Sequence, residues 1–210
     1  MAFGNSHKVV FSTISIVVFI LILICGISCG ATPSVPMQAT PPLSTPPQLP
    51  ASGEWIPDGI VSVGEYNGTK EYGDYELHWA GDEKYAYIAM KARTSGWVSM
   101  AVQPGSRMKD ADMVFGFVED GKAAVYDLFS IGDYGPHPPD TELGGTNDIL
   151  EFGGMEEGGY TIIEFKRALD TGDKYDKPIV SGSNKIIWAY GSGDSLTIKH
   201  ASRGYGELEF

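Results

Sequence analysis

Short runs of β-branched and aromatic residues recur from residue 54 to the C-terminus, and this feature limits the possible folds most. The breaks between them, such as "AGDEK", "EDGK" and "TGDKYDKP", have the Gly, Asp and Pro content of tight turns. We find no convincing helix pattern in this region. Many strands at this spacing predict an all-β fold, an antiparallel β-sandwich. The expected strands are 75–79, 85–92, 97–103, 113–120, 123–129, 160–166, 185–190 and 206–210.

The first expected strand, "YELHW", alternates between apolar and polar residues. The period of two directs Tyr75, Leu77 and Trp79 to one face and His78 to the other. We therefore expect His78 on a solvated face rather than in a site.

Residues 131–153 form a stretch that is too long for a hairpin and rich in Gly, Pro and Asp. Long ordered loops on a β scaffold often carry function. A solvated excursion has the same composition, so the composition does not choose between the two.

Residues 9–29 contain no charged residue and are almost entirely apolar, and Lys8 precedes them. This length suffices to span a bilayer, and the segment 1–29 has two interpretations. It is either an uncleaved membrane anchor or a lipoprotein signal peptide, because small residues precede Cys29, although Gly26 stands where leucine is usual. Both interpretations predict an extracytoplasmic, membrane-anchored protein.

Residues 30–53 are rich in Pro, Thr and Ser and predict a semi-extended linker ahead of a folded domain over 54–210. All 27 acidic residues and 14 of the 15 basic residues lie from residue 54 onward, which gives this domain a formal charge of −13. Such a surface disfavours nucleic acid as a partner.

Motifs of known enzyme classes are missing from the sequence. There is no GxSxG serine, no HExxH, and no thiol after Cys29. We therefore expect a domain without a catalytic site of its own. The sequence also lacks CxxCH, so any haem would be bound without thioether bonds.

Acidic residues in 170–178, "DTGDKYDKP", have spacings that can place oxygen ligands around calcium. The segment lacks the full EF-hand pattern, however. Asp and Gly in a hairpin turn explain it more simply.

Met108 and His200 each lie in an expected loop, where neither is explained as a core residue. Met108 stands between Arg107 and Lys109, and His200 precedes the last strand. If both loops fall at one end of the sandwich, a thioether and an imidazole can face each other, which is a ligand pair suited to haem iron. The simpler alternative is that both are surface residues.

The sequence resembles the DOMON family, in particular its haem-binding branch. It is similar to the cytochrome domain of cellobiose dehydrogenase and to the DOMON domains of dopamine β-monooxygenase-like proteins. The resemblance covers nearly all of 54–210. The matching stretches are residues 58–66, 75–92, 96–130, 158–179, 185–191 ("KIIWAYG") and 199–204 ("KHASRG").

This resemblance implies an immunoglobulin-like β-sandwich that binds either haem b or a sugar. In haem-binding members the axial ligands are a Met in an M-x-x-A-D-M/I-V stretch and a His in an H-x-x-R-G stretch, which here are Met108 and His200. Arg203 is a candidate partner for a haem propionate or a structural turn residue. The remaining candidates are apolar wall residues that can equally be core: Trp97, Met100, Phe115, Phe117 and Trp188. His137 is a candidate for a competing ligand or for the haem edge, but we expect it in an exposed loop.

The resemblance thus implies an exported, membrane-tethered b-type cytochrome domain that transfers electrons between separate redox partner proteins. Alternatives are a haem carrier or sensor, or a carbohydrate-binding module without redox activity. In the last case Trp55, Trp79 and Trp97 would supply a stacking platform.

Overall fold

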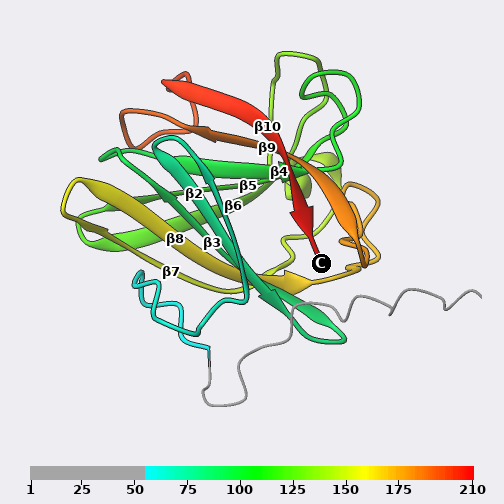
Figure 1. Ribbon diagram of the computed structural model, residues 1–210. Coiled ribbons are helices and arrows are strands. Elements are labelled where there is room, and N and C mark those ends of the chain that lie inside the picture. The colour runs from blue at the N-terminus through cyan, green and yellow to red at the C-terminus, as the bar shows by residue number, and fades with distance from the viewer. Residues whose placement is uncertain (1–54) are drawn as a thin grey trace, which may run out of the picture. The chain divides into compact units, whose positions relative to one another are not determined.

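Two antiparallel five-stranded sheets pack face to face in the structure, a computed structural model that describes residues 55–210 (Figure 1). The prediction of an all-β antiparallel sandwich is therefore confirmed. The first sheet has the order β1-β2-β3-β8-β7, with β1 Gly68–Tyr72, β2 Tyr75–Gly81, β3 Tyr85–Ala92, β8 Tyr160–Ala168 and β7 Ile149–Glu157. The second has the order β10-β9-β4-β5-β6, with β10 Ser202–Glu209, β9 Ser183–Tyr190, β4 Val98–Val102, β5 Asp112–Glu119 and β6 Lys122–Phe129.

The main core lies between the sheets and comes from alternate residues of the central strands. Ile88 and Met90 of β3 and Phe165 of β8 are completely buried there. Val98 and Ile186 face them from the second sheet. Burial of this apolar area is the dominant force that holds the two sheets together.

Two strands were not expected from the sequence, and both lie at edges of the first sheet. β1 is largely exposed, and β7 occupies the end of the stretch that we had expected to be a long loop over 131–153. Before β7 this stretch contains a 3₁₀ turn, η1, at Asp140–Leu143. The long-loop expectation is thus wrong for the residues from Ile149 onward.

A segment that precedes β1 covers part of the outer face of the first sheet. The buried carboxylate of Glu164 accepts hydrogen bonds from the Gly59 N–H at 2.6 Å and the Tyr66 hydroxyl at 2.7 Å. Trp55 Nε1 donates to the same hydroxyl at 2.9 Å. His78, expected on a solvated face, is half-buried beneath this segment, where its ring lies against that of Tyr66. The expectation of a solvated His78 is therefore wrong.

The predicted signal or anchor (1–29) and linker (30–53) lie outside the described residues. Within residues 55–210, no helix combines the length and apolar character needed to cross a bilayer.

Candidate functional site: an apolar cavity between Met108 and His200

The outer face of the second sheet is apolar. An antiparallel sheet usually turns one face to the core and the other to water, but β4 and β5 are almost entirely buried on both faces. A second hydrophobic cluster covers the outer side. Its buried members are Trp97, Ala101, Ala111, Met113, Phe115, Phe117, Leu128 and Ile187. A face of this kind has to be covered by other chain segments or by a ligand.

Loops from opposite ends of this sheet lean over its outer face. Val102 pairs with Ile186 at one end, where the loop that carries Met108 begins, and Val98 pairs with Tyr190 at the other, where the loop that carries His200 begins. The loops of Met108 and His200 therefore do not leave from one end of the sandwich, as the expectation from the sequence had required for the two residues to meet. The apolar face between the two ends brings the loops together, because each loop folds inward to cover it.

The Met108 loop is a tight, irregular turn. Its backbone passes through left-handed conformations at Arg107 (φ 55°) and Asp110 (φ 60°). The Gly105 N–H donates to the Lys109 carbonyl at 2.8 Å, and the Asp110 N–H donates to the Ser130 carbonyl at 2.8 Å. These bonds fix the loop to the start of the segment that follows β6.

The His200 loop is held by Trp97. The indole Nε1 donates to the Ile198 carbonyl at 3.0 Å, and the Gly191 N–H donates to the Trp97 carbonyl at 2.9 Å. The Ala201 N–H returns to the Tyr190 carbonyl at 2.8 Å. Trp97 thus positions a carbonyl two residues before His200.

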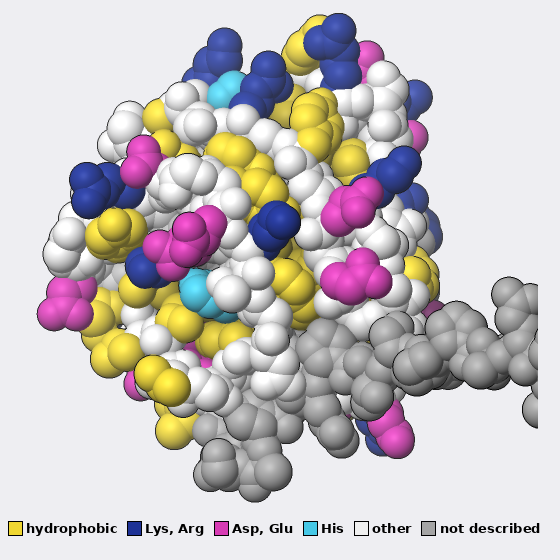
Figure 2. All heavy atoms as spheres, in the orientation of Figure 1, with side chains coloured by type: hydrophobic (Ala, Val, Ile, Leu, Met, Phe, Trp, Pro, Cys, Tyr) yellow, Lys and Arg dark blue, Asp and Glu magenta, His cyan; other side chains and the backbone are white. Residues whose placement is uncertain are grey.

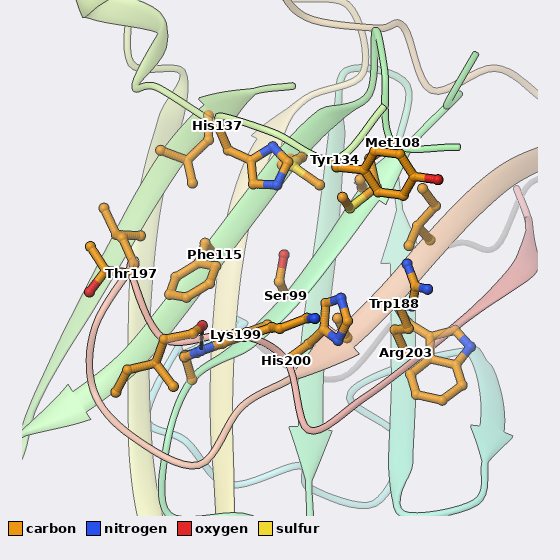
Figure 3. Close-up of a pocket in the computed structure, with 18 residues that line it drawn as sticks. Ser99, Met108, Phe115, Tyr134, His137, Trp188, Thr197, Lys199, His200 and Arg203 are labelled. Atoms are coloured by element: carbon orange, nitrogen blue, oxygen red, sulfur yellow. Dashed lines mark hydrogen bonds between the residues drawn. The ribbon is translucent and has the colours of Figure 1, made fainter. Parts of the chain in front are cut away.

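A cavity of about 480 Å³ lies between the two loops and the sheet. This volume falls within the roughly 300–1,000 Å³ typical of small-molecule and cofactor sites. Five of the candidates from the sequence line it, namely Trp97, Met108, Phe115, His200 and Arg203. In Figure 3, Met108 lies on one side of the cavity and His200 on the opposite side, and Phe115 lines the cavity to the left of both.

Three other wall candidates behave differently. Met100 belongs to the core between the sheets, and Phe117 packs in the outer cluster beyond the cavity lining. Trp188 reaches the lining, but its ring stacks on Tyr72 and Tyr75. Met100 and Phe117 are therefore not wall residues. The strand period turns Met100 to the other face of the sheet, and Phe117 lies farther along its strand than the cavity reaches.

His137 lines the same cavity, on the side of Met108 (Figure 3). The expectation of an exposed loop residue is wrong, because the chain after β6 folds back over the outer face of the sheet. Its Nδ1 is buried and has no hydrogen-bond partner among the described residues. The sequence offered no signal for this position beyond the residue type.

Both histidines of the cavity are disposed to be neutral. Burial, and to a smaller degree the nearby His200, lowers the pKa of His137. Burial and then the charge of Arg203 lower the pKa of His200. A neutral imidazole presents a nitrogen lone pair, which is the form that binds metals.

Cations stand at the His200 side of the cavity. Arg203 extends from β10 toward the cavity, and Lys199 lies beside His200 (Figure 3). Neither pairs with a carboxylate among residues 55–210. In Figure 2, Lys and Arg side chains gather along the upper rim of the molecule, although the chain as a whole is acidic. The site can therefore accept an apolar ligand that carries acidic groups.

The proposed tryptophan platform for carbohydrate is contradicted by the structure. Trp55, Trp79 and Trp97 are all buried and lie in three separate hydrophobic clusters. No shared stacking surface exists for them.

Comparison with known proteins agrees with the sequence resemblance. The DOMON domain family model matches residues 71–191. DBH-like monooxygenase protein 1 of Mus musculus is 32% identical over 122 residues, 58% of this chain and 19% of that protein. MOXD1 homolog 1 of Drosophila melanogaster is 29% identical over 145 residues, 65% of this chain and 20% of that protein. The chain thus spans about a fifth of the length of these relatives.

Among solved structures, the cytochrome b domain of pyranose dehydrogenase from Coprinopsis cinerea superposes with a TM-score of 0.49 and 15% identity, covering 64% of this chain and 76% of that one. The cytochrome domain of Myriococcum thermophilum cellobiose dehydrogenase gives a TM-score of 0.47 and 11% identity, covering 64% and 74%. Since the family model matches more than half of the chain, this chain belongs to the DOMON domain family.

Proposed function

We propose that this DOMON domain binds haem b without a covalent bond, with Met108 and His200 as iron ligands, and acts in electron transfer. The observation that supports this most is the single cavity with a thioether on one side and an imidazole on the other (Figure 3). Haem then supplies a reversible one-electron couple, and Met/His ligation favours a raised reduction potential.

The residues present fit such a group. Trp97, Phe115 and Ile187 provide an apolar wall that excludes water. Arg203 and Lys199 supply cations for two carboxylates, which a macrocycle with propionates requires. The described part of the chain contains no cysteine, which agrees with non-covalent binding.

If Met108 and His200 both bound the iron, no coordination position would be left for oxygen or a substrate. We therefore infer that the domain has no catalytic site of its own. Trp97 holds the loop of His200, the backbone bonds of the Met108 loop hold the sulfur, and the stiff sheet between them keeps their separation constant. A site of constant geometry suits electron transfer, because little rearrangement accompanies the change of charge.

The partners and location also remain proposals. We propose separate redox proteins as the electron donor and acceptor. The apolar segment 9–29 and the linker 30–53 favour an extracytoplasmic domain tethered to a membrane.

The experiment that tests the proposal is a visible absorption spectrum of the full-length protein with haem, recorded oxidised and after dithionite reduction. We expect sharp α and β bands of low-spin haem on reduction, lost in Met108→Ala and in His200→Ala. Matched controls outside the cavity, Met155→Ala and His78→Ala, keep the bands. A protein that folds and takes up no haem refutes the proposal.

His137→Ala distinguishes the competing ligand. His137 lies near Met108 and has an unpartnered ring nitrogen. If Met108→Ala leaves the low-spin spectrum and the reduction potential of the natural protein unchanged, and His137→Ala alone abolishes that spectrum, the iron is held by two histidines and the assignment of Met108 is wrong.

A further inference from the structure

Four buried aspartates meet on the side of the second sheet that faces away from the cavity. Asp112 begins β5 and Asp127 lies in β6. Asp140 belongs to η1, and Asp176 to the loop that follows β8. Each is at least 92% buried. Carboxylates are rarely buried to this degree unless they are paired or bind a cation.

The one cation that pairs with this cluster does not balance the negative charge of its four carboxylates. Arg167 Nη1 donates to Asp112 Oδ2 at 2.6 Å, and its Nη2 lies 3.5 Å from Asp176 Oδ2. It is the only Lys, Arg or His that forms an ion pair with the cluster among residues 55–210. Four carboxyl groups around one guanidinium leave an excess of three negative charges when all are ionised.

Several carboxylate oxygens have no partner. The Asp148 N–H donates to Asp127 Oδ2 at 2.7 Å, and Asp112 Oδ2 also accepts from the Lys177 N–H at 2.8 Å. Oδ1 of Asp112, of Asp127 and of Asp176 is buried without a hydrogen bond or an ion pair, and so are both oxygens of Asp140, whereas Asp176 Oδ2 has only its ion pair with Arg167. An unsatisfied buried polar atom costs about 1–3 kcal/mol, and five together call for a ligand that is not a protein side chain.

Burial and the neighbouring negative charges raise the pKa values of three of these aspartates. Burial, followed by the charges of the other aspartates, raises the pKa of Asp140 to about 8. Burial is also the main cause that raises the pKa of Asp127 to about 7 and that of Asp176 to about 6. The charges that act on Asp140 are those of Asp127, Asp176, Asp112 and Asp173, so its carboxyl group lies near theirs.

We propose that Asp112, Asp127 and Asp176 bind a calcium ion, with Asp140 facing the same site. One oxygen of each of the three lies within 4.8 Å of the others. Two oxygens on opposite sides of Ca²⁺ are separated by about twice the metal–oxygen distance of roughly 2.3–2.6 Å, so a single ion can reach all three.

The ligand chemistry selects calcium among the common cations. The site offers only oxygen, which disfavours zinc and copper. Magnesium retains several waters in a near-ideal octahedron, whereas this site is buried and assembled from two strands, a 3₁₀ turn and a loop. Calcium accepts six to eight oxygens in an irregular arrangement.

The site differs from the one that the acidic segment 170–178 indicated. Asp170 and Asp173 of that segment accept hydrogen bonds from the nearby Gly172 and Tyr175 N–H groups, as turn residues do. Only Asp176 turns into the interior. The other two proposed ligands come from β5 and β6, far away in the sequence.

The test is calcium titration of the full-length, metal-free protein by isothermal titration calorimetry and thermal unfolding, with MgCl₂ in parallel. We expect one calcium ion per chain and a higher Tm in CaCl₂ than in EGTA. Asp127→Asn and Asp176→Asn should each weaken calcium binding by at least about tenfold, because each removes a charged ligand. Both variants should be no less stable than the natural protein in EGTA, since each relieves repulsion.

Asp170→Asn is the matched control, because it makes the same change at an exposed position of the same loop. It should leave calcium binding unchanged. The proposal is overturned if the natural protein shows neither heat nor a Tm shift with calcium, if Asp127→Asn binds calcium as tightly as the natural protein, or if Asp170→Asn abolishes binding. The titration of the natural protein decides the matter alone if the variants do not fold. None of these readouts depends on haem.

Discussion

Replacing Trp97 by Phe should separate the structural role of this residue from its role in positioning His200. The indole is 4% exposed, and its Nε1 donates to the Ile198 carbonyl at 3.0 Å. The change removes roughly two methylene equivalents of buried surface, about 1.6 kcal/mol. It also removes one hydrogen bond, about 1 kcal/mol. We expect the free energy of unfolding of the haem-free protein to fall by about 2–3 kcal/mol, measured by urea denaturation.

The same change should weaken haem binding about fivefold, because the loop of His200 loses about 1 kcal/mol of fixation. Trp55→Phe is the matched control. Trp55 is also buried and also donates a hydrogen bond from Nε1, at 2.9 Å to Tyr66, but it packs in a different cluster outside the cavity. It should cost similar stability and leave haem affinity and the low-spin spectrum unchanged. Equal haem affinities in the two variants would refute the positioning role of Trp97.

Three further changes test other parts of the structure. Gly191→Ala places a Cβ against the indole of Trp97. It should lower the free energy of unfolding, measured with urea, and the low-spin fraction of bound haem, measured by absorption. An unaltered absorption spectrum would contradict this expectation. Arg203→Gln removes a cation at the cavity that disfavours the more positive ferric state, so a potentiometric titration should give a lower reduction potential, and an equal potential would argue against contact with the cofactor. Burial is the main cause that raises the pKa of Glu164 above its ordinary 4.5, so its contribution to stability is present below pH 4.5 and is lost as the pH rises through the higher folded-state value. The natural protein should therefore lose stability relative to Glu164→Gln as the pH rises above about 4.5, and a difference between the two that stays constant with pH would show that the group is not perturbed.

The sequence predicted the strands that contribute alternating residues to the core, and it missed those that do not. β1 and β7 lie at the edges of a sheet, where few side chains are buried and the apolar alternation is weak. In β7, Gly153 contributes no side chain to the apolar pattern, because the Pro57 carbonyl lies where a Cβ would be.

The site was foreseen only through its residue types. Met108 and His200 stood out because neither fits a core, but their meeting depends on two loops that leave opposite ends of a sheet. His137 was expected in an exposed loop and Asp176 in a turn, whereas Asp127 lay in an expected strand. The burial of His137, Asp140 and Asp176 follows from the path of the chain after β6, which local sequence does not encode.

Side chains of β5 and β6 alternate between the two faces of the sheet, and this limits how the lengths of these strands can change. Asp112 and Asp127 point to the inner side of the sheet, whereas the next residues, Met113 and Leu128, line the cavity. A one-residue deletion in either strand would exchange the two sets, placing a carboxylate in the apolar cavity and an apolar chain in the acidic cluster. These strands should therefore accept many substitutions but no change of length. Insertions and deletions that survive selection should be confined to the exposed hairpin between them, at Asp120 and Gly121.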